Sequence, residues 1–132
     1  MLDGYFYSIR ILVCHPVMSA ADLASGMGEE AKYSGEPRSN GKPSFWSRVT
    51  ETRGERGFFS GVAGAISWLE GRRVFVQAVL ATGGKIEVIV NLPGDRNIGD
   101  SWKMENMARA AALGVTLGVE VFPNIRGVTS DT

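Results

Sequence analysis

Residues 74–92 constrain the fold more than any other part of the sequence. Two runs, Val74–Ala81 and Lys85–Leu92, are rich in β-branched residues and are separated only by Thr82-Gly83-Gly84. Short loops between antiparallel strands need positive φ angles, which glycine adopts without a steric cost. The pattern predicts a β-hairpin that turns at Gly83-Gly84. Because a hairpin interrupts a regular alternation of parallel strands and helices, the sequence favours an α+β fold.

Four further strands are predicted from runs of apolar and β-branched residues that end at proline, glycine or polar residues. The first covers Tyr5–Val13 and stops before His15-Pro16. Two short strands are expected at Ala31–Ser34 and Ser44–Thr50, and the last at Thr116–Phe122. With the hairpin, these runs make about six strands.

Three segments have the three- and four-residue apolar spacing of amphipathic helices. They are Ala20–Met27, Phe58–Glu70 and Trp102–Leu113. Ser19 is placed to cap the first helix, with Asp22 completing a pair that resembles a capping box. Asp100 or Ser101 is placed to cap the third helix, and Gly114 is the expected left-handed stop.

The order of these elements is β-α-β-β-α-β-β-α-β. It predicts a two-layer α+β sandwich, in which three helices pack on a mostly antiparallel sheet of about six strands. The 132 residues contain no repeat and no linker long enough to separate domains. We therefore expect a single domain over residues 1–132, with a core at about 5–123 and a loose C-terminal tail at 124–132.

Composition argues against several classes of protein. Fourteen basic residues balance fourteen acidic ones, whereas a protein that coats nucleic acid or an anionic membrane normally has a basic excess. Cys14 is the only cysteine, so no intramolecular disulfide can form and a reducing compartment is favoured. The sequence has no secretory leader pattern and no apolar run of membrane-spanning length. A soluble, cytoplasmic protein is the expectation.

Several short motifs occur in a characteristic order along nearly the whole chain. They are Tyr7-x-Ile9-x-Ile11, His15-Pro16, Gly35-x-Pro37-Arg38, Phe45-Trp46, Gly83-Gly84 and Leu117-x-Val119-x-Val121-Phe122-Pro123. This order resembles the bacterial domain-of-unknown-function family 4279. The resemblance implies a small single-domain bacterial protein, and it supplies no catalytic residue, cofactor or activity.

Motifs of known chemistry give no catalytic site. His15 is the only histidine, which excludes a multi-histidine metal centre, and it adjoins Cys14, so the two side chains point to opposite faces of a strand. No Gly-x-Ser-x-Gly motif occurs, and Gly83-Gly84-Lys85 lacks the spacing of a phosphate loop. We therefore assign no catalytic residue, no metal and no cofactor. His15 is either a pocket-lining base or a strand-end histidine that is hydrogen-bonded to a nearby loop.

The stretch from Arg38 to Arg56 mixes cations with aromatic residues. Five cations, Arg38, Lys42, Arg48, Arg53 and Arg56, surround Phe45 and Trp46, and only Glu51 and Glu55 oppose them. Such a patch can dock an acidic protein surface through an aromatic anchor, or stack bases and hold phosphates. In the other interpretation, Trp46 belongs to the core and the arginines around it are solvated.

Three functions remain open. We expect a non-enzymatic interaction module, of the kind found among small antitoxin or immunity proteins, which binds another protein through residues 35–56. The alternative is a protein or enzyme that binds a small anion or carboxylate in a cleft near His15, Arg38 and Trp46. Binding of single-stranded nucleic acid is the third. The candidate binding residues are His15, Arg38, Phe45, Trp46 and Arg48. A homodimer could form by pairing of the strand Thr116–Phe122.

Overall fold

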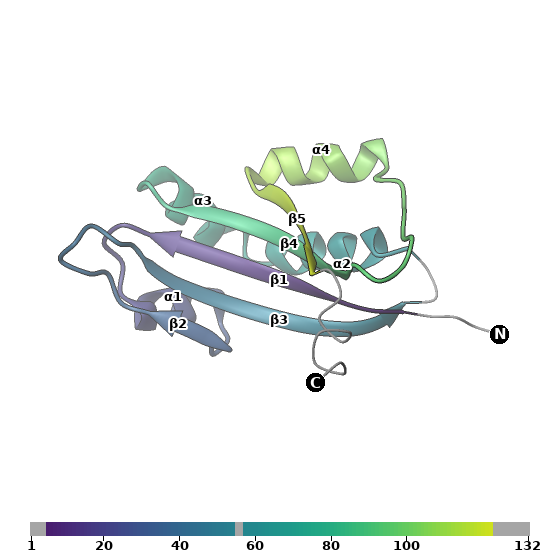
Figure 1. The fold of residues 1–132 in the computed structure, drawn as a ribbon. Coiled ribbons are helices and arrows are strands. Elements are labelled where there is room, and N and C mark those ends of the chain that lie inside the picture. The colour runs from purple at the N-terminus through teal and green to yellow at the C-terminus, as the bar shows by residue number, and fades with distance from the viewer. Residues whose placement is uncertain (1–4, 55–56, 123–132) are drawn as a thin grey trace, which may run out of the picture.

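The computed structural model describes residues 5–54 and 57–122, and a five-stranded sheet runs through its centre (Figure 1). The elements in chain order are β1 (Tyr5–His15), α1 (Ala20–Met27), β2 (Tyr33–Gly35), β3 (Ser44–Gly54), α2 (Phe59–Glu70), α3 (Arg73–Ala81), β4 (Lys85–Pro93), α4 (Met104–Leu113) and β5 (Thr116–Phe122). The predicted C-terminal tail at 124–132 lies outside the described residues.

The strands lie in the order β2-β3-β1-β4-β5. β1 pairs antiparallel with both β3 and β4, and β2 pairs antiparallel with β3. Among the strands that the structure describes, β4 and β5 alone are parallel, as expected for two strands joined through a helix, here α4. The protein is therefore an α+β sandwich with a mostly antiparallel sheet, as predicted.

The residues of β1 show how the sheet acquires two different faces. Tyr7, Ile9, Ile11 and Val13 are at most 5% exposed and belong to the core, whereas the residues between them are more exposed. Buried residues from each of the four helices that the structure describes pack in one core with these residues of β1, so these helices cover the same side of the sheet. Figure 1 shows how the helices are arranged around the sheet. We call the other side, with the side chains of Phe45, Ser47 and Val49 of β3 and the even-numbered side chains of β1, the open face.

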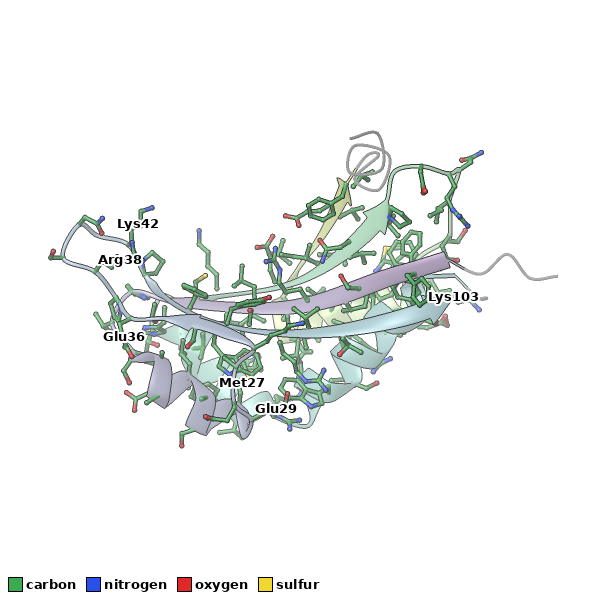
Figure 2. All side chains as sticks on the ribbon, turned by 60° about the horizontal axis from the view of Figure 1, so that its bottom comes forward. Met27, Glu29, Glu36, Arg38, Lys42 and Lys103 are labelled. Carbon is green, nitrogen blue, oxygen red and sulfur yellow. The ribbon has the colours of Figure 1, made fainter. Side chains whose placement is uncertain are left out.

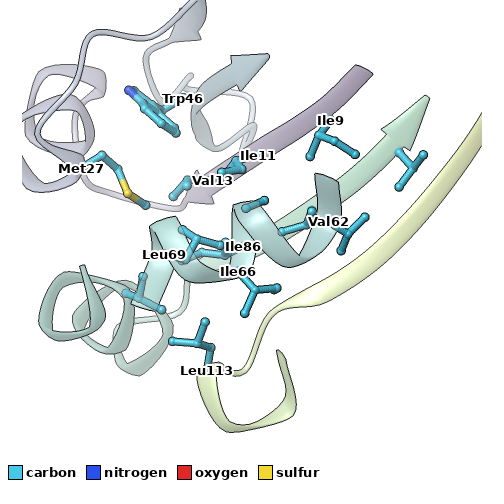
Figure 3. Packing of buried hydrophobic residues seen from close by; sticks show 14 of the residues in the cluster. Ile9, Ile11, Val13, Met27, Trp46, Val62, Ile66, Leu69, Ile86 and Leu113 are labelled. Carbon is cyan, nitrogen blue, oxygen red and sulfur yellow. The ribbon is translucent and has the colours of Figure 1, made fainter. Parts of the chain in front are cut away.

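The core lies between the sheet and the helices (Figure 3). Val62, Ile66 and Leu69 of α2 pack there at the spacing that predicted this helix. Trp46 of β3 and Met27 of α1 close one end of the core, and both are 0% exposed. The sequence therefore located both the central strand and its principal helix.

The predicted hairpin is wrong, because Val74–Ala81 lies in the helix α3. The β-branched composition of this run concealed a helical spacing. Val76 and Val79, three residues apart, are 0% exposed, whereas Val74 is 87% exposed. A strand of the sheet would instead have buried alternate residues. Tertiary packing of one helical face outweighed the strand preference of valine.

Glycines after α3 end this helix instead of turning a hairpin. Gly83 has a φ of 97°, and the Gly84 N–H donates to the Val79 carbonyl at 2.8 Å, which is a helix stop with a left-handed residue. A Cβ at Gly84 would come within 2.8 Å of the Cys14 carbonyl oxygen. Glycine is therefore needed where the chain passes close to the end of β1.

The described part of the chain thus forms five strands and four helices, where about six strands and three helices were predicted. The helix after β4 begins at Met104, two residues later than predicted, and no side chain caps it. Asp100 instead accepts a hydrogen bond from the Phe59 N–H at 2.8 Å, at the start of α2. The predicted Ser19 cap is confirmed, because its hydroxyl accepts from the Asp22 N–H at 3.0 Å.

Candidate functional site

His15 is a buried residue at the end of β1 and is 1% exposed. Its Nδ1 accepts hydrogen bonds from the N–H groups of Val17 at 3.1 Å and Met18 at 3.0 Å. Its Nε2 lies 2.7 Å from Oγ1 of Thr82, which follows α3. Both ring nitrogens thus have hydrogen-bond partners within the chain. This arrangement matches the interpretation of His15 as a strand-end histidine that is hydrogen-bonded to a nearby loop.

Cys14 lies on the open face, on the other side of the sheet from His15. The β1–β3 register places Cys14 beside Phe45 and His15 beside Ser44, which confirms that the two neighbouring side chains diverge. Burial raises the pKa of the Cys14 thiol, the nearby Glu87 carboxylate raises it further, and Lys85 opposes them. A thiol with a raised pKa is a poor nucleophile at neutral pH.

Trp46 is part of the core, not of an accessible surface. Its ring stacks on Trp68 with centroids 6.0 Å apart and planes at 10°, and its Nε1–H donates to the Glu29 carbonyl at 3.0 Å. The indole therefore has both an apolar and a polar partner inside the protein. The sequence had left open whether Trp46 is core or contact surface, and the structure places it in the core.

Two arginines lie over the ring of Trp68, the second member of this tryptophan pair. The guanidinium carbon of Arg72 lies 3.6 Å from the Trp68 ring centroid, and that of Arg48 lies 4.8 Å from it. Arg48 Nε also donates to the Glu29 carboxylate at 2.7 Å, and Arg72 Nε donates to the Met27 carbonyl. Both guanidinium groups therefore have partners within the chain. Arg48 thus contributes to the packing of this region.

Arg38 is exposed in the loop between β2 and β3. Two backbone hydrogen bonds shape this loop, from Arg38 N to Lys42 O at 2.9 Å and from Gly41 N to Arg38 O at 3.1 Å. The loop projects past the ends of the helices, and Arg38 and Lys42 lie near its tip (Figures 1 and 2). The nearby Glu36 carboxylate accepts from the Ala20 N–H at 3.0 Å, so it is engaged with α1.

Two aromatic side chains lie on the open face beside this loop. The β2–β3 register pairs Gly35 with Phe45 and Tyr33 with Ser47, all on the face opposite Trp46. Tyr33 is 58% exposed and Phe45 is half-buried. A side chain at position 35 would collide with the Phe45 ring, so glycine allows this ring to lie against β2. We call Tyr33, Phe45, Arg38 and Lys42 together the hairpin surface.

The five predicted site residues thus fall into two groups. Arg38 and Phe45 belong to the hairpin surface, whereas His15, Trp46 and Arg48 lie on the helix side of the sheet. His15 and Trp46 are at most 1% exposed, so a ligand from solvent does not reach them in this structure. The side chain of Arg53 and all of Arg56, which the sequence placed in the same basic patch, lie outside the described side chains.

Tyr33 was missed as a site residue by the sequence reasoning. The sequence places it only in a short predicted strand, whereas in the structure its ring is exposed and the Lys32 ammonium lies 5.9 Å from the ring centroid. The signal was available in the alternation of β3. Once Trp46 is assigned to the core, Phe45 and the register partners of Phe45 and Ser47 must lie on the other face.

Polar side chains of β1, β4 and β5 contact one another near the middle of the open face. Arg10 pairs with Glu120 of β5 at 3.4 Å, and the Asn91 amide donates to the Ser8 hydroxyl at 3.0 Å. Nε of Arg10 and Oδ1 of Asn91 are buried without a hydrogen-bond partner. Arg10 thereby crosses β4 above Ile89, which is 5% exposed although it lies on the open face.

A cavity of about 570 Å³ lies at the junction of α2 and α3. Glu70, Arg72, Arg73 and Phe75 are among the residues that line it. Arg72 is held by the Met27 and Trp68 carbonyls, and Arg73 lies 4.0 Å from Glu70. None of the predicted site residues lines this cavity.

Within residues 5–54 and 57–122, no three His, Cys, Asp or Glu side chains come together as a metal site. Over the same residues, no helix combines the length and the apolar character needed to cross a bilayer. Comparisons with known proteins found no matching family model, curated protein or solved structure.

Proposed function

We propose that this protein is a non-enzymatic interaction module that binds an acidic protein through the hairpin surface. The observation that carries the proposal is the combination, on one projecting end of the sheet, of the exposed Tyr33 with the exposed cations Arg38 and Lys42. Tyrosine and arginine are the residue types that most often dominate binding energy at protein interfaces.

The aromatic part of the surface suits a protein partner. Tyr33 presents a ring with two rotatable side-chain angles, so its immobilisation costs little entropy compared with a long aliphatic side chain. Phe45 beside it adds apolar surface, and its ring lies over Gly35, where no side chain displaces it. The helix-free face continues from these rings to Leu12 and Cys14 of β1, so a partner can contact a broad surface.

The charge of the hairpin surface selects an acidic partner. Arg38 and Lys42 carry two positive charges at the loop, while Glu36, the nearest acid along the chain, already binds the start of α1. Cations at the rim of an interface mainly increase the association rate and make binding sensitive to salt. We therefore infer that the partner presents carboxylates opposite the loop and an apolar contact opposite Tyr33.

We also propose that the chain belongs to domain-of-unknown-function family 4279, on the strength of its ordered motifs. Gly35-x-Pro37-Arg38 spans the end of β2 and the start of the β2–β3 loop, and Phe45-Trp46 lies at the start of β3. Phe45 lies on the open face and Trp46 in the core. The Phe45-Trp46 motif would therefore supply one residue to the hairpin surface and one to the core.

Affinity capture from the native host, with quantitative mass spectrometry, tests the function. Wild type is compared with the double variant Arg38→Glu/Lys42→Glu and with Lys103→Glu, which reverses an exposed cation at the opposite end of the molecule (Figure 2). A partner of the hairpin surface is retained by wild type and Lys103→Glu. We expect its affinity for the double variant, measured with the purified partner, to fall about tenfold or more.

Two results would count against the proposal. Equal recovery of every captured protein by the wild type and the double variant removes the hairpin surface from the interaction. Salt-sensitive binding of a fluorescent single-stranded oligonucleotide, lost in the double variant, favours the nucleic-acid alternative instead.

A further inference from the structure

β5 forms one edge of the sheet and has a strand on one side only among the residues that the structure describes. Val119 is 53% exposed and Val121 is 54% exposed. Exposed edges usually carry lysine, proline or a bulge that prevents pairing with another chain. The seven residues of β5 contain no lysine and no proline, and they pair with β4 in an uninterrupted register. The opposite edge, β2, is only three residues long.

Backbone geometry leaves the hydrogen-bonding groups of alternate β5 residues on the outer side. The carbonyl of Phe122 accepts from the N–H of Gly94, just after β4, so it points towards β4. The N–H and C=O groups of a strand alternate in direction along the chain. The groups of Leu117, Val119 and Val121 therefore point away from β4 and can pair with another strand.

Twofold symmetry allows few ways to pair β5 with a copy of itself. An antiparallel edge pair related by a twofold axis has one residue opposite itself, and residues equally far from it oppose one another. With Val119 at the axis, all seven residues pair. Leu117 then faces Val121, Gly118 faces Glu120 and Thr116 faces Phe122.

This register is self-complementary on both faces of the sheet. Leu117, Val119 and Val121 lie on the helix side, beside Val88, Val90 and Leu92, and in the pair they meet only apolar residues. On the open face each Glu120 lies opposite a glycine and keeps its own Arg10 partner at 3.4 Å. A register centred on Glu120 would oppose two carboxylates, and like charges directly opposite destabilise a sheet.

We propose that two copies of this chain join through β5 in the Val119-centred antiparallel register, so that the two sheets form one continuous ten-stranded sheet. The partner is a second copy of the chain, because the edge is complementary to itself in side-chain type, backbone hydrogen-bonding groups and charge. The helices of both copies then lie on the same side of the joined sheet. This interface is at the edge opposite β2, so the dimer and the hairpin surface are tested independently.

Analytical ultracentrifugation of the purified chain tests the dimer. Wild type is expected at twice the mass of one chain, and Val119→Lys at the mass of one, because its two ammonium groups would meet at the twofold axis. Val74→Lys places the same charge on the exposed side of α3 and should remain dimeric. Circular dichroism of each variant separates loss of pairing from loss of fold.

Cysteine cross-linking tests the register without depending on a charged variant. In a Cys14→Ala background, Val119→Cys should oxidise readily to a covalent dimer, because the two residues would be a hydrogen-bonded pair about 5.5 Å apart at Cα, within disulfide reach. Val121→Cys alone should cross-link far less, whereas an equimolar mixture of Val121→Cys and Leu117→Cys should form the heterodimer. A monomeric wild type, a dimeric Val119→Lys, or Val119→Cys that oxidises no faster than Val74→Cys would each overturn the proposal.

Discussion

The Nε2 atom of His15 lies 2.7 Å from the Oγ1 atom of Thr82, so the end of β1 is joined to the end of α3. Because Nδ1 of His15 accepts two backbone N–H groups, the ring proton must reside on Nε2, which donates to Thr82. The Thr82 hydroxyl in turn donates to the Ala78 carbonyl at 2.7 Å. Both ring nitrogens of the only histidine in the sequence are thus satisfied by a hydrogen-bond network inside the protein.

Replacement of His15 should therefore affect stability. His15→Ala leaves the N–H groups of Val17 and Met18 without their acceptor and opens a cavity, so we expect a loss of about 3 kcal/mol in the free energy of unfolding. Thr82→Val removes the hydroxyl that pairs with Nε2 and with the Ala78 carbonyl, but it opens no comparable cavity and leaves Nδ1 with both of its donors, so it should cost less. Urea denaturation measures both, with the exposed Ser39→Ala as control. Stability unchanged in His15→Ala would contradict the structural role.

The outcome for Val74–Ala81 shows what the sequence could and could not predict. Central elements such as α2 followed from spacing, because their buried positions recur at helical intervals. In Val74–Ala81 the β-branched composition and the following glycines both favoured a hairpin, and only packing against the sheet revealed a helix. The same error conceals the parallel pairing of β4 with β5, because a hairpin would make Val74–Ala81 a neighbour of β4 in the sheet.

The candidate site was predicted in part for a related reason. The region of the β2–β3 loop could be found from its cations, but the face to which each aromatic residue points depends on strand register. Phe45 and Trp46 are adjacent, and only their pairing with Cys14 and Val13 decides which is core. Asp100, one of two residues predicted to cap the helix after it, instead binds the start of α2, and its partner Phe59 is too far away in the sequence, at 41 residues, for local spacing to indicate the contact.

Substitution of the two aromatic residues should separate core from surface. Trp46→Ala removes a stacked, fully buried ring and should cost about 3–5 kcal/mol of unfolding free energy. Tyr33→Ala removes a ring that is 58% exposed and should change stability by about 0.5 kcal/mol or less. Thermal unfolding followed by circular dichroism makes the comparison. Equal destabilisation by the two variants would refute the assignment of faces.

The bond between Asp100 and the start of α2 should behave as a helix cap supplied from a distant loop. Asp100→Ala should lower the free energy of unfolding by about 1 kcal/mol, because α2 has no capping side chain of its own. Gly57→Ala should also destabilise, since its Cβ would collide with the Asp100 carboxylate. Asp95→Ala in the same loop is the matched control. Chemical denaturation in which Asp95→Ala and Asp100→Ala behave alike would exclude the cap.

The ion pair between Glu70 and Arg109 predicts a dependence of stability on pH. Arg109 donates to both carboxylate oxygens, at 3.1 and 2.6 Å, and this hydrogen bonding lowers the pKa of Glu70 despite some desolvation. A lowered pKa in the folded state stabilises the fold at pH values above the ordinary glutamate pKa and ceases to do so as pH falls through the folded pKa. The stability difference between wild type and Glu70→Gln should therefore be present at neutral pH and disappear in acid.

Urea denaturation at several pH values measures this difference, and the exposed Glu105→Gln provides the control for loss of a carboxylate in α4. A difference that grows as the pH is lowered would contradict the sign of the Glu70 shift. A difference that is also present for Glu105→Gln would remove its attribution to the pair with Arg109.

Site-specific photo-cross-linking in the native host tests the central claim most directly. A photoreactive phenylalanine analogue is placed at Tyr33, and at Val74 as a control on the helix side that is more exposed than Tyr33. We predict a covalent adduct of a protein at position 33, mapped by mass spectrometry to an acidic segment and abolished by Arg38→Glu/Lys42→Glu. No protein adduct at position 33, or the same adduct at position 74, would contradict a contact surface at the β2–β3 hairpin.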